Sequence, residues 1–258
     1  MHELLGMPPN HAAHGAEIDF VILIIHIFMA VLFVGWGSFF AVALFKFRGS
    51  KHKRADYAGV KSKMATYIEI AVALAEAALL IGFAVPLWSE RVDNFPSEKD
   101  AVVVKLVAEQ FAWNIHYAGA DGVFGSGAAK FVDQQTNPLG LDPDDPNGKD
   151  DITTINQLHL PVDKPAIIHL SSKDVIHCFN LPFFRVKQDI IPGMSIPVWF
   201  TPIQTGKSEI ACAQLCGLGH YRMKGFLTVH EQADFDKWMA EQAEALSKTE
   251  GEDDFWDE

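Results

Sequence analysis

The 258-residue sequence contains few cysteines, fewer basic than acidic residues, and no Cys-x-x-Cys-His haem attachment motif. Three cysteines are too few for a disulfide scaffold, and without the haem motif the chain attaches no c-type haem of its own. The 21 Lys and Arg residues are outnumbered by 33 Asp and Glu residues. This balance argues against nucleic-acid binding, because neutralising phosphates requires cations. A hydrophobic fraction of 49% excludes a disordered chain.

Two long apolar runs stand out near the N-terminus. In the first, residues 20–45, only His26 and Ser38 are polar, and as a helix the run would rise about 39 Å. The second, residues 67–88, is interrupted by Glu69 and Glu76. A bilayer core is about 30 Å thick, so both runs predict transmembrane helices. A signal peptide is the alternative for the first run, but residues 1–19 contain no Lys or Arg and the run is too long.

The segment between the two runs is strongly basic. It supplies Lys46, Arg48, Lys51, Lys53, Arg54, Lys61 and Lys63. The positive-inside rule places this loop, residues 46–66, in the cytoplasm and both termini outside. Residues 89–258 then form an external domain with 14 basic and 27 acidic residues.

The external domain shows the pattern of an all-β fold. Short runs rich in Val, Ile and aromatic residues are separated by turn residues, at 101–110, 112–117, 155–160, 166–171, 196–201, 207–211 and 225–230. An acidic, Gly- and Pro-rich insertion occupies 119–152, and a helical pattern covers 232–248 before an acidic tail. We therefore expect an external N-terminal segment (1–19), a helical hairpin (20–88), a β domain (89–230) and a C-terminal helix with its tail (231–258).

The residues with metal-binding chemistry gather between two predicted strands. Cys212, Cys216, His220 and Met223 fall within twelve residues, and His177 lies upstream after another strand-like run. Thiolate, thioether and imidazole are soft ligands that suit copper, and one upstream His with a Cys, His and Met from one loop is the blue-copper pattern.

Simpler interpretations exist for each of these residues. Cys212 and Cys216 could form a disulfide in an oxidising compartment. A zinc site would use the Cys and His residues but gain nothing from a thioether. Met223 taken alone would be a core residue. Cys178 has no metal-ligand spacing of its own, so we interpret it as structural.

The motif resembles that of subunit II of the haem-copper oxygen reductases, the cytochrome c oxidase subunit with a binuclear CuA centre. The family pattern Cys-x-Glu-x-Cys-Gly-x-x-His-x-x-Met matches residues 212–223 apart from one position, and segments 174–177 and 187–193 match as well. The resemblance implies a two-helix transmembrane hairpin and a cupredoxin-like Greek-key sandwich. It also implies two copper ions held by His177, Cys212, the Gln214 carbonyl, Cys216, His220 and Met223.

The function implied by the resemblance is electron transfer in a terminal respiratory oxidase. Single electrons would pass from a cytochrome c-type donor, or a haem domain of a larger complex, through the copper pair to haems in subunit I, where oxygen is reduced to water. Subunit I, further oxidase subunits and membrane lipid would be the partners. The location implied is the bacterial cytoplasmic membrane, with the β domain on the periplasmic side.

Three other functions fit parts of the same pattern. A copper subunit of a nitric oxide reductase shares this architecture, and a membrane-tethered copper carrier without enzyme partners would need the same site. A structural subunit like those of quinol oxidases would lack the ligand residues, all of which are present here.

The sequence departs from the family pattern at two positions. Gln214 replaces a Glu whose carboxylate reaches a magnesium ion at the border with subunit I, which puts that magnesium site in doubt because amides are weaker ligands for hard cations. In the run that precedes the β domain, Trp113 matches the second family Trp. Phe111 stands at the first, where cytochrome c docks. The acidic surface would attract a basic donor, or would serve only to keep the domain soluble.

Two carboxylates lie within the second apolar run. Glu69 and Glu76 are seven residues apart and therefore share a helix face. Charge inside a membrane span is costly, which makes both functional candidates. The resemblance aligns Glu69 with a family Glu at the mouth of a proton pathway into subunit I, with a snorkelling interfacial acid as the alternative. Glu76 has no family counterpart.

Overall fold

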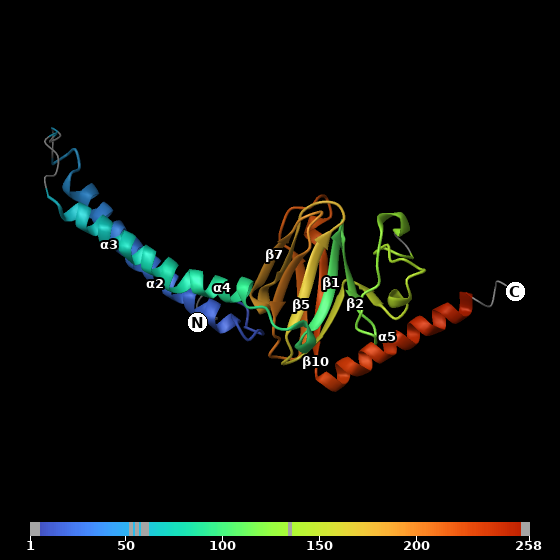
Figure 1. The fold of residues 1–258 in the computed structure, drawn as a ribbon. Helices are drawn as coiled ribbons and strands as arrows, with labels where there is room; N and C mark the ends of the chain where they lie inside the picture. The colour runs from blue at the N-terminus through green and yellow to red at the C-terminus, as the bar shows by residue number, and fades with distance from the viewer. Residues whose placement is uncertain (1–5, 52–53, 55–56, 58–61, 134–135, 254–258) are drawn as a thin grey trace. The chain divides into compact units, whose positions relative to one another are not determined.

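A computed structural model describes residues 6–51, 54, 57, 62–133 and 136–253, with side chains described as far as residue 246. The chain forms two compact units (Figure 1). One unit comprises residues 16–93 and consists of helices. The other combines the segment up to Gly15 with the chain from Asn94 onward and contains all the strands.

The helical unit contains two stretches long and apolar enough to cross a membrane. The first is α2, Gly15–Lys46, and the second, Met64–Asp93, joins α3 (Met64–Leu79), η1 (Leu80–Ala84) and α4 (Val85–Asp93). At about 1.5 Å per residue, the 32 residues of α2 rise about 48 Å, well above the thickness of a bilayer core. The predicted hairpin is confirmed, although both stretches extend beyond the apolar runs of the sequence. The first turn of α2 contains Glu17, at the helix end where the dipole favours an acidic residue.

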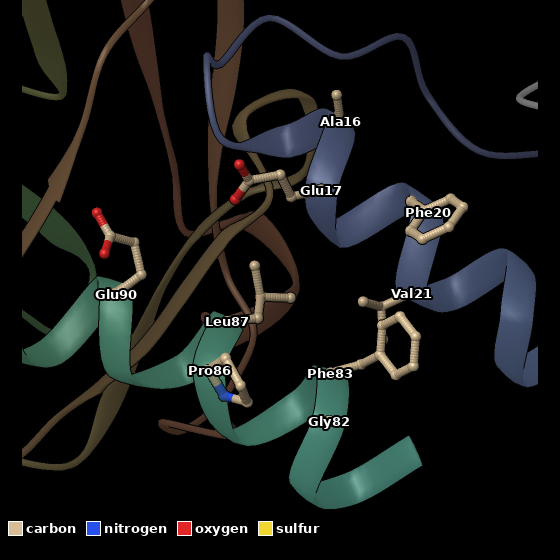
Figure 2. Close-up of a pocket in the computed structure, with 9 residues that line it drawn as sticks. All are labelled: Ala16, Glu17, Phe20, Val21, Gly82, Phe83, Pro86, Leu87 and Glu90. Atoms are coloured by element: carbon tan, nitrogen blue, oxygen red, sulfur yellow. The ribbon is translucent and has the colours of Figure 1, made fainter. Parts of the chain in front are cut away.

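The second stretch contains one turn of π-helix. Pro86 has no amide hydrogen, and in a regular α-helix its ring would meet the carbonyl of Gly82. The π-helical turn η1, which includes Gly82, precedes it and accommodates this break. Figure 2 shows the groove between this region and the first turns of α2, lined by Ala16, Glu17, Phe20, Val21, Gly82, Phe83, Pro86, Leu87 and Glu90.

The β unit is a sandwich of two five-stranded sheets. The first sheet has the order β3-β2-β1-β5-β8 and the second the order β4-β10-β9-β6-β7. The strands are β1 (Val102–Glu109), β2 (Ala112–Tyr117), β3 (Ile152–Ile155), β4 (Gln157–Pro161), β5 (Ala166–Ser172), β6 (His177–Leu181), β7 (Val186–Ile190), β8 (Ile196–Phe200), β9 (Gly206–Cys212) and β10 (Lys224–His230). The arrangement confirms the predicted cupredoxin-like sandwich.

Alternating side chains from the two sheets fill the space between them. Val104, Leu106 and Ala108 of β1 are fully buried, while their neighbours in the strand are partly exposed. In β4, Leu158 and Leu160 are likewise fully buried, and the residue between them is partly exposed. This period of two is what places apolar side chains on one face of a strand.

Three strands, β3, β6 and β7, are absent from the pattern of apolar runs in the sequence. β6 begins with His177, and β7 reads Val-Lys-Gln-Asp-Ile, with only its terminal residues Val186 and Ile190 buried. Because β7 is an edge strand, polar residues are tolerated between those two positions.

The segment before α2 and the C-terminal helix both belong to the β unit. Backbone bonds join His11 to Phe183 and to Ile203, and Ala13 to Thr201. Helix α5, Gln232–Asp253, starts directly after β10 and packs on the sandwich through Phe235 and Trp238. The sequence predicted this helix over 232–248.

Candidate metal centre

Three strand ends bring the predicted ligands together. His177 begins β6 and Cys212 ends β9, and these strands pair at Phe179 and Cys212. Cys216, His220 and Met223 lie in the loop between β9 and β10. The base of this loop is closed because the Cys212 amide donates to the Met223 carbonyl over 3.2 Å. All six predicted ligand residues therefore meet at one end of the sandwich.

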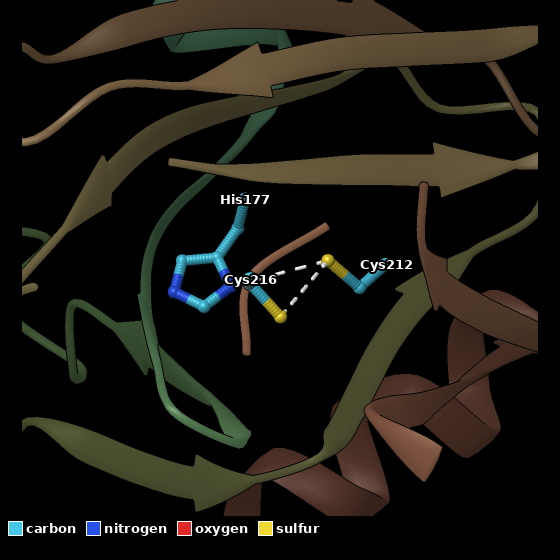
Figure 3. A group of neighbouring side chains, drawn as sticks. All are labelled: His177, Cys212 and Cys216. Carbon is cyan, nitrogen blue, oxygen red and sulfur yellow. Dashed lines mark hydrogen bonds between the residues drawn. The ribbon is translucent and has the colours of Figure 1, made fainter. Parts of the chain in front are cut away.

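The donor atoms converge on one small volume. The two cysteine Sγ atoms are 3.8 Å apart, and Cys212 Sγ lies 3.9 Å from His177 Nδ1 (Figure 3). Cys216 Sγ lies 3.6 Å from His220 Nδ1 and 3.7 Å from Met223 Sδ. The Gln214 carbonyl oxygen is 3.2 Å from Cys212 Sγ. A disulfide would need about 2.05 Å, so the two thiols are free and face each other.

The two facing thiols differ in acidity. Burial acts against ionisation of Cys212, but hydrogen bonds with His177 and with the backbone at Cys178 and Gln214 outweigh it and lower its pKa to about 6. Burial and the neighbouring Cys212 raise the pKa of Cys216 to about 11. One thiolate therefore forms readily, whereas the second needs a compensating positive charge.

Cys178 lies beside this pair in the chain but differs in character. It is fully buried, and burial together with a hydrogen bond to Asp189 raises its pKa to about 12. The group of side chains close enough to share a metal ion is His177, Cys212 and Cys216, and it does not include Cys178.

An outer set of contacts fixes the orientation of His177. Its Nε2 atom lies 2.9 Å from Asp174 Oδ1, so the ring donates there and turns Nδ1 toward Cys212. The other Asp174 oxygen accepts from the backbone amide of Gln110 over 2.7 Å. The edge of the fully buried Trp113 ring packs against His177, with ring centroids 6.3 Å apart. Partners of this kind set the tautomer and orientation of a ligating histidine.

Phe111 covers the metal-binding loop. Its partly buried ring lies on Gly217 and Gly219, where a Cβ atom would stand 3.3 Å and 2.4 Å from ring carbons. Gly217 also has a φ of +130°, a conformation that favours glycine. Gln110, next to Phe111, donates from Nε2 to the Cys216 carbonyl over 2.6 Å. The turn between β1 and β2 thus packs on the outer side of this loop and is hydrogen-bonded to it.

Two of these residues have no role in the sequence pattern. Asp174 lies within the matching segment 174–177, and its position three residues before His177 is a usable signal. The bond between Gln110 and Cys216 spans 106 residues of sequence, and no local pattern reveals it.

The donor set fits copper. Two thiols, two imidazoles, a thioether and a carbonyl face one another, and thiolate with thioether ligands selects copper over hard cations. A structural zinc site takes four Cys or His ligands in a closed tetrahedron and would leave Met223 without a role. Met223 is buried and its sulfur faces Cys216, which places it within the set.

Known proteins provide independent comparisons. The family model for the periplasmic domain of cytochrome c oxidase subunit II matches residues 102–229. The alternative cytochrome c oxidase subunit 2 of Bradyrhizobium diazoefficiens is 35% identical over 205 residues, which are 79% of this chain and 72% of that protein. The heme-copper oxidase subunit 2 of Aeropyrum pernix is 27% identical over 77% of this chain and 78% of that protein.

A solved structure is similar as well. The crystal structure of the periplasmic domain of subunit II of cytochrome oxidase from Bradyrhizobium japonicum is 28% identical and covers 58% of this chain and 98% of its own, with a TM-score of 0.43. The match to the domain model and the extended identity to the Bradyrhizobium diazoefficiens protein coincide with the two apolar helices, the sandwich and the Cys/His cluster. The chain therefore belongs to the cytochrome c oxidase subunit II family.

Proposed function

We propose that this chain is the electron-accepting subunit of a terminal respiratory oxidase and holds a binuclear copper centre. Membership of the family implies an electron-transfer role, copper, and assembly with subunit I of a haem-copper oxidase. The convergence of two facing thiols with two imidazoles and a thioether supports two metal ions in place of one. The observation that carries the proposal is the 3.8 Å separation of the two cysteine sulfurs.

The residues of the chain would have distinct tasks at this centre. Cys212 and Cys216 would bridge the two ions, while His177 and His220 would each bind one, with Met223 and the Gln214 carbonyl as further ligands. Bound copper would supply a one-electron couple shared between two metal ions. The burial of His177, Cys216 and Met223 excludes water, and strand ends hold their side chains in place, which keeps rearrangement on electron transfer small.

The two apolar stretches anchor the chain in a membrane. We infer that this is the bacterial cytoplasmic membrane, with the basic loop inside and the β domain on the periplasmic side. Electrons would come from a cytochrome c-type donor and leave for haems in subunit I. Glu69 and Glu76 are exposed on one face of α3, and we infer that Glu69 marks a proton path into subunit I.

Binding of a magnesium ion at the border with subunit I would depend on the side chain of Gln214. Gln214 is exposed in this chain and lacks the charge of the family Glu. A neutral amide supports a hard cation less well than a carboxylate does. We infer that the copper ligands are kept while a magnesium site is weakened.

Copper counting and EPR spectroscopy on the full chain in detergent test the proposal. We expect two coppers per chain and a spectrum of one unpaired electron shared by both. Cys216→Ser should abolish that spectrum, whereas Cys178→Ser, a matched change of a buried thiol outside the ligand set, should keep it. A single blue-type copper, or two equivalent coppers in the Cys216→Ser chain, would contradict the bridging assignment.

A further inference from the structure

A cavity of about 320 Å³ lies on the outer face of the first sheet. Leu106 of β1 is fully buried between the two sheets, so its neighbours Lys105 and Val107 lie on the outer face. The parallel register of β1 with β5 places His169 beside Lys105 and Ser171 beside Val107, and all four residues line the cavity.

The ammonium group of Lys105 is held in place by the acidic insertion, which lies beside β2 in Figure 1. Its Nζ atom is 4.2 Å from the centroid of the Phe124 ring, which also lines the cavity. The Phe124 ring packs in a T-shaped arrangement against His116 of β2, with ring centroids 4.9 Å apart. His116 in turn is fixed by a 2.6 Å hydrogen bond to the buried carboxylate of Asp151. Two strands and the insertion therefore build this position together.

Lys105 has no anionic partner within the described part of the chain. No ion pair or hydrogen bond is made to its Nζ atom there, and Asp151 is already bound to His116 and to the Gly125 amide. Burial lowers the pKa of Lys105, against the attraction of Asp151. Lysine titrates far above neutral pH, so the group is a cation whose lost hydration is not replaced. This occurs in a domain with 27 acidic and 14 basic residues, where carboxylates are plentiful.

The remaining lining selects among anions. His169, Ser171 and Ser195 contribute an imidazole and two hydroxyl groups, which can donate hydrogen bonds to an oxyanion. The outward-facing valines of β1 and the Phe124 ring form apolar walls. Glu98, an exposed residue of η2 (Glu98–Asp100), also lines the cavity and would repel an anion of high charge. The volume is at the small end of the range for ligand pockets.

We propose that this cavity binds a small organic monocarboxylate. Its carboxylate would lie beside Lys105, and its apolar body would pack on Val107 and Phe124. Such a ligand satisfies both the unpaired ammonium group and the apolar walls. Inorganic phosphate would leave the walls in contact with water and would meet the acidic field of the domain with a higher charge. The inference does not depend on bound copper, because none of the cavity residues belongs to the proposed ligand set.

Fluorine NMR on the full chain in detergent tests the inference. The probe is para-fluorobenzoate, and para-fluorobenzyl alcohol is its uncharged counterpart. Line broadening during a titration gives the dissociation constant of each probe. We expect saturable binding of the benzoate at about 1 mM or tighter, and binding of the alcohol at least about tenfold weaker, because hydrogen bonds to charged groups are the stronger ones. Inorganic phosphate at equal concentration should not displace the benzoate.

Variants place the probe in the cavity. Lys105→Gln should weaken benzoate binding about ten- to a hundredfold. Lys130→Gln is the matched control and should bind normally, because Lys130 Nζ also lies 4.2 Å from an aromatic ring centroid, that of Phe131, but outside the cavity. Val107→Trp fills the cavity while keeping Lys105, and should abolish binding in a chain with an unchanged circular dichroism spectrum.

Several results would overturn the inference. Absence of saturable binding would refute it outright, and equal binding of the benzoate and the alcohol would show that the ammonium group plays no part. Displacement by phosphate as effective as that by unlabelled benzoate would indicate a simple anion site. Normal binding to the Lys105→Gln chain, or an equal loss in the Lys130→Gln chain, would place the probe elsewhere. Binding that is lost in the assembled oxidase would show that a neighbouring subunit covers the cavity.

Discussion

Replacing Asp174 with Asn should weaken copper binding about two- to thirtyfold while leaving the fold intact. Asp174 lies outside the ligand set, but its Oδ1 atom is 2.9 Å from His177 Nε2 and accepts from the Val175 amide over 2.7 Å. Its Oδ2 atom accepts from the Gln110 amide. Burial alone would raise the pKa of Asp174, yet these bonds lower it, so the group is a carboxylate at neutral pH.

The magnitude follows from what Asn keeps and what it loses. Its amide oxygen can still accept from His177, but the negative charge that favours this ring orientation is gone. Hydrogen bonds to charged groups contribute about 1.5–3 kcal/mol, against about 1 kcal/mol for neutral ones. The difference, about 0.5–2 kcal/mol, corresponds to about two- to thirtyfold in the dissociation constant.

Competition with a copper chelator of known affinity, on the full chain in detergent, measures this constant. Asp163→Asn is the matched control, because Asp163 lies in the turn between β4 and β5 and has a positive φ that Asn tolerates. Equal affinities for the Asp174→Asn and wild-type chains would refute the idea that Asp174 orients His177. An equal loss in the Asp163→Asn chain would indicate a general effect of the substitution.

Three further changes have defined outcomes. Gly219→Ala places a methyl group 2.4 Å from a Phe111 ring carbon, so the ring must move, and we expect a changed EPR spectrum with copper content retained. Glu69→Gln should slow turnover of the assembled oxidase without changing copper content, whereas unchanged turnover would make Glu69 merely interfacial. Burial and the neighbouring His230 lower the pKa of His159 to about 4, so between about pH 6.5 and 4 the unfolded chain binds a proton that the folded chain does not. The free energy of unfolding should therefore fall by about 1 kcal/mol from pH 7 to pH 5, after allowance for the partial exposure of His159. In urea unfolding, the His159→Phe chain should show a weaker dependence of this free energy on pH.

Local patterns in the sequence predict most of the elements of this fold. The apolar runs predict the two spanning helices because a bilayer requires length and composition alone. The period of two predicts strands such as β1, where one face is buried and the other half-exposed. The same rule misses β7, since an edge strand with only Val186 and Ile190 buried carries too weak a pattern.

The candidate ligand set could be proposed from the sequence because four of its side chains lie in one loop. Its surroundings could not. The bond from Gln110 to Cys216 and the packing of Phe111 on Gly217 and Gly219 join segments about a hundred residues apart. Such contacts depend on which strand ends meet, and this is decided by the pairing of whole sheets. The sequence predicted Phe111 and Trp113 together as candidates for electron entry. Trp113 is fully buried and packs against His177, whereas Phe111 is only partly buried.

The opposed acidities of the two thiols explain why the centre is built for a cation. Near pH 7 Cys212, with its pKa of about 6, is largely ionised, whereas Cys216, with a pKa of about 11, is not. A second thiolate 3.8 Å from the first is unfavourable in a buried site unless positive charge lies between them. Metal binding supplies that charge and displaces the remaining proton. The chain holds both sulfurs in this position by strand ends and by the hydrogen bond from Gln110 to Cys216, so the second thiolate forms favourably only with a cation between the sulfurs.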